Sequence, residues 1–129
     1  MAWLRPAGCR PRDTGNVVLR VLHIITRLEL GGAQRNTLFT VANLDRSSFS
    51  VGLAWGPGDE LDSEAGNIEA LDRYEISTLI RPIAPLADLR ALKKLRSVIR
   101  SFRPTIVHTH SSKAGILGRM AAHLERVPI

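Results

Sequence analysis

Residues 17–34, VVLRVLHIITRLELGGAQ, decide the fold of this chain. The apolar run from Val17 to Ile25 is typical of a strand that is buried on both faces. Gly31-Gly32 breaks this run, and a helix is predicted from Ala33 to about Leu44. A buried strand, a glycine turn and a helix begin a βαβ unit, so the segment predicts a parallel sheet covered by helices.

The same alternation continues to the end of the chain. Further strands are predicted over residues 49–55, 76–80 and 105–109, with helices over 86–102 and 112–125 and one short helical piece within 59–75. This pattern predicts an α/β fold with an incomplete doubly wound, Rossmann-like parallel sheet in the order 3-2-1-4. The last helix is expected to turn four apolar residues inward: Ile116, Leu117, Met120 and Leu124.

Length and composition favour one domain preceded by a tail. The chain has 129 residues and a formal charge of +6. Residues 1–16, with prolines, glycines and arginines but no periodicity, are expected to be a disordered basic tail, and residues 17–129 to form the domain. No apolar stretch reaches the length of a membrane span, and the single cysteine excludes an internal disulfide framework. We expect a cytoplasmic protein, or one that is peripheral at the inner face of the membrane.

Two turns are candidate binding sites because each follows a predicted strand. In a parallel sheet such turns lie at the carboxyl edge, where ligands bind. At the first turn, Gly31 and Gly32 leave the backbone bare at a helix N-terminus, where N–H groups can contact a phosphate or a sugar hydroxyl. Gln34 lies in the first turn of that helix and is expected to reach the same ligand. The turn lacks both the G-x-G-x-x-G and the P-loop patterns.

The second turn reads HTHSSKAG, residues 108–115. Ser111 and Ser112 are good N-cap residues, which accounts for them without a ligand. Lys113 is different, because a cation in the first turn of a helix opposes the helix dipole unless an anion is bound there. Arg35 has the same position on the first helix, which suggests a ligand that carries phosphate. Arg119 is expected either to reach this pocket or to lie in solvent.

His108 and His110 alternate along the predicted strand and therefore point to the same side of it. A third ligand would let them hold zinc. No cysteine or carboxylate lies nearby in the sequence, so no metal is expected. His110, at the tip of the strand, is instead predicted to contact substrate.

The chain resembles the amino-terminal domain of glycosyltransferase family 4 enzymes in three stretches. They are RVLHII followed by GGAQ (residues 20–25 and 31–34), RPI with DL (81–83 and 88–89), and PTIVHTHSSKAGILGR (104–119). The resemblance covers about residues 18–129, and the last stretch, followed by Val127-Pro128, is its most specific part.

The resemblance implies half of a two-domain GT-B fold. It implies sugar transfer from a nucleotide sugar, with retention of anomeric configuration and without a metal or other cofactor. The acceptor would be a polysaccharide, a glycolipid or another acceptor, either a sugar or lipid-linked. Gly31, Gly32 and Gln34 would line the cleft between donor and acceptor, and His110, Ser111, Ser112 and Lys113 would hold the acceptor or its phosphate. The donor half of the family's active site has no counterpart here, so we expect a fragment that is inactive alone.

Two other functions are compatible with the pattern. One is a non-enzymatic, flavodoxin-like module that binds a phosphorylated ligand. The other is a nucleic-acid binder that uses the basic segment of residues 90–103, but this segment lacks interleaved aromatic residues, and no nucleic-acid partner is expected. The sequence does not identify the donor sugar, the acceptor or the linkage.

Overall fold

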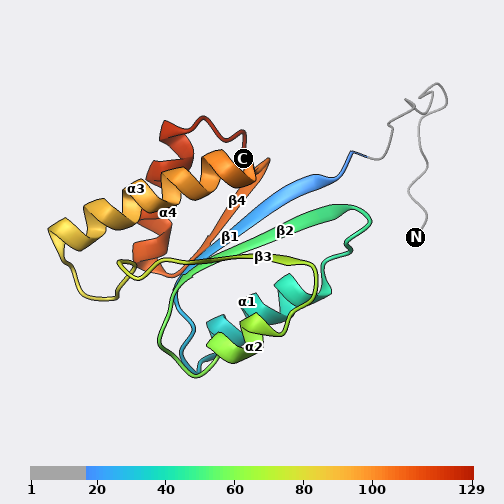
Figure 1. Ribbon diagram of the computed structural model, residues 1–129, viewed down its shortest axis with the longest axis horizontal. Coiled ribbons are helices and arrows are strands. Elements are labelled where there is room, and N and C mark those ends of the chain that lie inside the picture. Colours follow the sequence, from blue (N-terminus) through green and yellow to red (C-terminus); the bar gives the residue numbers. More distant parts are fainter. Residues whose placement is uncertain (1–16) are drawn as a thin grey trace, which may run out of the picture.

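The computed structural model describes residues 17–129, so the predicted tail, residues 1–16, lies outside the described residues. Strands and helices alternate, as the sequence predicts (Figure 1). The elements are β1 (Leu19–Arg27), α1 (Gly32–Asn43), β2 (Phe49–Gly56), α2 (Asp62–Gly66), β3 (Leu71–Glu75), α3 (Pro85–Phe102), β4 (Ile106–His110) and α4 (Ser112–Leu124).

The four strands form one parallel sheet in the order β3-β2-β1-β4, which confirms the predicted order. The chain moves outward from β1 to β2 and β3, and then returns to place β4 on the other side of β1. The carboxyl ends of β1 and β4 therefore lie next to each other, with Ile25 of β1 paired with His110 of β4. This is the switch point at which doubly wound sheets bind ligands.

Each face of the sheet is covered by its own pair of helices (Figure 1). On one face, Leu22 and Ile24 of β1 pack in a core with residues of α3 and α4, such as Leu95 and Ala121. On the other face, Ile25 packs in a second core with residues of α1 and α2. Successive side chains of β1 point to opposite faces and are apolar on both, which explains the continuous apolar run in the sequence.

The predicted position of the third strand is wrong. It was expected over residues 76–80, but β3 covers Leu71–Glu75. β3 is an edge strand in which only Leu71 is buried, so its sequence, LDRYE, has no apolar run. The apolar residues Ile76 and Leu79 come directly after it and are buried in the connection to α3. Because these buried residues are apolar, the sequence of this loop resembles that of a strand.

The predicted inner face of α4 is also largely wrong. Leu117 is buried, but Ile116, Met120 and Leu124 are 58%, 47% and 47% exposed. Small residues face the sheet instead, and Gly118 is the tightest of them: a Cβ there would lie 2.7 Å from Thr109 Cγ2. The helix packs closely on β4 and β1 because these positions lack bulk, and the larger apolar side chains are left outside.

Beyond α4, the chain returns to the outer edge of β4. The Val107 N–H donates to the Ile129 carbonyl at 2.8 Å, and the Ile129 N–H donates to the Thr105 carbonyl at 3.3 Å. This is the pattern of a parallel ladder. Ile129 thus pairs with β4 as a parallel neighbour.

Candidate functional site

A cleft of about 590 Å³ lies where β1 and β4 end. It combines apolar side chains with hydroxyl, amide and charged groups, a composition common in ligand sites. Four residues predicted from the sequence line it, namely Gln34, Ser111, Ser112 and Lys113. The other lining residues are Thr26, Arg27, Arg81, Ile83, Asp88, Ile116 and Leu117.

Ser111 begins α4 in an unusual conformation. Its φ of 79° and ψ of 160° lie in a region that is almost exclusive to glycine. Its hydroxyl does not cap its own helix; Ser111 Oγ lies 2.7 Å from Thr26 Oγ1, and Thr26 Oγ1 accepts a hydrogen bond from the Ala114 N–H at 3.2 Å. A side chain at the end of β1 therefore satisfies the first turn of α4. The N-cap role expected of the serine side chains is carried out by Thr26.

The glycine turn contributes to the cleft through Gln34. Gly31 is the N-cap of α1 and offers no side chain to it, so the first N–H groups of the helix remain available to a ligand. A Cβ on Gly31 would lie 2.5 Å from Gln34 Oε1, which shows that the Gln34 amide folds back over Gly31. Gly32 has open space around it. Neither glycine lines the cleft itself.

Lys113 is not an unpaired cation at a helix N-terminus. Its Nζ lies 2.5 Å from Asp88 Oδ1 and donates hydrogen bonds to the carbonyls of Ile80, at 2.7 Å, and Pro82. The hydrogen bond from Lys113 is the main reason why the pKa of Asp88 lies below its ordinary value. Asp88 also accepts the Ala84 N–H at the start of α3. Lys113 therefore connects the 80–82 loop and α3 to α4. These contacts were not predicted from the position of Lys113 in the first turn of its helix.

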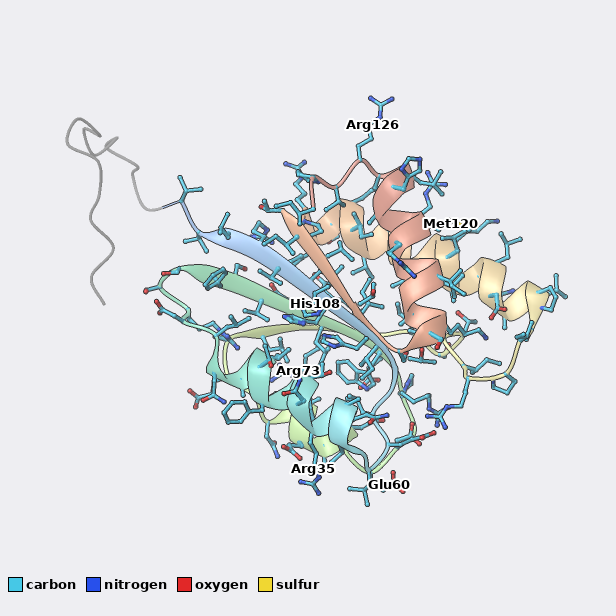
Figure 2. The ribbon with its side chains drawn as sticks, turned by 180° about the vertical axis from the view of Figure 1, so that it is seen from behind. Arg35, Glu60, Arg73, His108, Met120 and Arg126 are labelled. Carbon is cyan, nitrogen blue, oxygen red and sulfur yellow. The ribbon has the colours of Figure 1, made fainter. Side chains whose placement is uncertain are left out.

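Two other predicted cations lie away from the cleft. Arg119 donates from Nε to the Gly115 carbonyl of its own helix at 2.8 Å and does not line the cleft. Arg35 lines a separate hollow beside α1 and points away from the sheet in Figure 2. The structure therefore does not bring Arg35 and Lys113 together around one ligand. The arginines that do line the cleft, Arg27 and Arg81, are paired with Asp59 and Glu29.

His110 lies on the face of the sheet that α1 and α2 cover, together with His108 and His23. His108 is labelled in Figure 2. His23 Nδ1 lies 3.1 Å from His110 Nε2, and the His108 and His110 rings stack with their centroids 4.3 Å apart. Burial first, and the neighbouring imidazoles second, lower the pKa of His23 and that of His110 to about 4. Both rings are consequently neutral at pH 7.

Sequence reasoning missed several residues at this edge. Thr26 and Arg27 end β1, Asp88 holds Lys113, and Ile83 and Ile116 form an apolar wall. Arg81, Ile83 and Asp88 belong to the stretches that carry the family resemblance, and this signal was available. Thr26 and His23 gave no local signal, because their partners lie more than 80 residues away along the chain.

Chemically, the edge offers free N–H groups at the start of α1, hydroxyls, paired cations and an apolar wall. Helix N-termini bind anions, and hydroxyl and amide groups recognise sugars. Among residues 17–129, the structure contains no helix with the length and hydropathy of a membrane span.

Comparisons with known proteins agree with this chemistry. The family model for Glycosyltransferase Family 4 matches residues 30–129. The UDP-Gal:alpha-D-GlcNAc-diphosphoundecaprenol alpha-1,3-galactosyltransferase of Escherichia coli is 34% identical over 114 residues, which are 85% of this chain and 28% of that protein. The chain therefore spans less than a third of the length of this relative.

A solved structure shows the same fold. The crystal structure of MurG from Acinetobacter baumannii matches with a TM-score of 0.68 at 16% sequence identity, and the match covers 84% of this chain and 32% of MurG. At this identity the likeness concerns the fold alone. The expected class, a Rossmann-like α/β half of a GT-B fold, is confirmed.

Proposed function

Because the chain belongs to glycosyltransferase family 4, we propose that it is the acceptor-side part of an enzyme that transfers a sugar from a nucleotide sugar, with retention of configuration. The cleft at the ends of β1 and β4 carries this proposal. It lies at the switch point of the sheet and gathers Gln34, Ser111 and Ser112 around one space. The donor would be held mainly by protein outside these residues.

We propose a sugar linked to a lipid through a diphosphate as the acceptor. The name of the Escherichia coli relative describes such an acceptor, and the cleft has the matching chemistry. Ile83, Ile116 and Leu117 form an apolar wall that suits the first part of a lipid chain. Arg27 and Arg81 border the same space and offer further donors to phosphate oxygens.

The remaining residues take roles that follow from their positions. The N–H groups at the start of α1 and the Gln34 amide would face the donor phosphates, and fixed dipoles of this kind stabilise the charge that develops on a departing phosphate. Ser111 and Ser112 would contact acceptor hydroxyls. Lys113 would act as a positioning residue, because its contacts hold the 80–82 loop beside the cleft.

Binding of a short lipid-diphosphate GlcNAc to the 129-residue chain tests the proposal. We expect saturable binding that Ser112→Leu abolishes, because the added bulk enters the cleft. Ser97→Leu, the same change at an exposed position of α3, should bind normally. Equal binding by both variants would show that the acceptor does not bind in the cleft. Binding of simple phosphates with no gain from the sugar or the lipid would favour the phosphate-binding module instead.

A further inference from the structure

The three histidines on the α1 side of the sheet have a geometry that the proposed function does not use. His23 comes from β1, and His108 and His110 come from β4, where His108 is the direct register partner of His23. One ring nitrogen from each residue can be chosen so that the three lie within 4.8 Å of one another. The sequence lacked a third ligand near His108 and His110; the sheet supplies it from 85 residues away.

The shortest of these separations is close to the one expected around a single bound ion. Two imidazole nitrogens bound to one tetrahedral zinc ion lie roughly 3.3 Å apart, and His23 Nδ1 and His110 Nε2 are already 3.1 Å apart. His23 is 1% exposed, and its Nε2 has no hydrogen-bond partner among residues 17–129. The one hydrogen bond between His23 and His110 therefore leaves this buried imidazole under-satisfied.

Accessibility changes in steps across the cluster. His23 is buried, His110 is half-buried and His108 is exposed. An ion can therefore enter from the side of His108, where the cluster meets solvent. Three histidines form a donor set that suits zinc and neighbouring divalent transition metals.

We propose that His23, His108 and His110 bind one divalent transition-metal ion, for which Zn²⁺ is the appropriate probe. The ion would join β1 to β4 next to the turn that carries Ser111. It would stabilise the edge of the sheet that forms the cleft, because a ligand that binds only the folded chain raises its stability. This inference is independent of the proposed function and assigns the ion no part in sugar transfer.

Zinc titration of the 129-residue chain, without an affinity tag and with Cys9→Ser to remove its thiol, tests the site. We expect one equivalent of Zn²⁺ to bind, and Co²⁺ in its place to give the visible bands of a four-coordinate site. His108→Ala should weaken binding by about tenfold or more. This variant should fold, because His108 is exposed. His123→Ala, at an exposed histidine near the end of α4, should bind like the parent chain.

The melting temperature provides a second measurement. Zinc should raise it for the parent chain and for His123→Ala, and much less for His108→Ala. Absence of saturable 1:1 binding by the folded parent chain would overturn the proposal. Equally tight binding by His108→Ala would overturn it as well.

Discussion

Ser111 is the residue at which the cleft constrains the backbone most. It holds a positive φ that its side chain disfavours, and its hydroxyl contacts Thr26. Ser111→Ala should lower the free energy of unfolding by about 1 kcal/mol through loss of this contact. Ser111→Gly loses the same contact but relieves the backbone, so it should be more stable than Ser111→Ala by about 1 kcal/mol or more. Urea denaturation of both variants measures this difference, and a less stable glycine variant would show that the backbone is not strained.

Substitutions at Gly31 and Gly32 test the position of the Gln34 side chain, because only Gly31 lies against it. Gly31→Ala should push the Gln34 amide out of its present position, because the new Cβ would meet Gln34 Oε1. Gly32→Ala meets nothing within 4 Å and should raise helix stability by about 0.5 kcal/mol. The side-chain amide signals of Gln34 in an NMR spectrum should move in the first variant only. The same shift in both would mean that Gly31 has no special relation to Gln34.

At the scale of elements, Lys113 connects the starts of α3 and α4. Its partners are Asp88 of α3 and the carbonyls of the loop before it. Lys113→Ala should therefore lower the melting temperature, and clearly more than Lys93→Ala, which removes an exposed lysine of α3. Thermal melts followed by circular dichroism provide the comparison. Equal melting temperatures for the two variants would show that Lys113 does not stabilise the fold, and ligand binding would remain as its role.

Glu125 connects the far ends of the same two helices and makes stability depend on pH. Hydrogen bonds from Arg100 and then Arg96 lower the pKa of Glu125 below its ordinary value of 4.5. A carboxyl whose pKa is lowered by folding stabilises the protein above its unfolded pKa, and this stabilisation is lost as the pH falls through the folded pKa. Glu125→Gln should be less stable than the parent chain at pH 7.

The difference between Glu125→Gln and the parent chain should shrink as the pH is lowered below about 4.5. Urea midpoints from pH 7 to pH 3 measure it. A difference that stays constant across this range would contradict a titrating Glu125, whereas Glu69→Gln, at an exposed glutamate away from α3 and α4, should show no such pH dependence.

For the whole molecule, the sequence was sufficient to predict those parts of the fold that follow from local patterns of apolar residues and turns. The alternation of apolar runs and glycine turns predicted the parallel sheet and its order, since β1 has a continuous apolar run and α3 has apolar residues at helical spacing. It failed at β3, because an edge strand buries too little to show a pattern, and at α4, because small residues make its contact with the sheet. In both cases the deciding factor was packing against distant elements.

The candidate site was predictable in part for the same reason. Gln34, Ser111, Ser112 and Lys113 follow strands that end at one edge, and topology alone brings them to the cleft. The partners of these residues were not predictable from local sequence. Asp88 satisfies Lys113, Thr26 satisfies the start of α4, and His23 completes the histidine group, each across a long sequence separation. Site residues can thus be predicted from their position after a strand, whereas their supporting contacts depend on residues far apart in the sequence.

The central claim is that the cleft at the ends of β1 and β4 holds a lipid-linked sugar acceptor. Photo-crosslinking tests it most directly, with a GlcNAc-diphosphate probe whose short lipid carries a photoreactive group, followed by peptide mapping of the labelled chain. We expect labelling in the segments 81–88 and 111–117, which supply the apolar wall, and competition by the unlabelled acceptor. Labelling confined to β3 and α2, or labelling that the acceptor does not reduce, would contradict it.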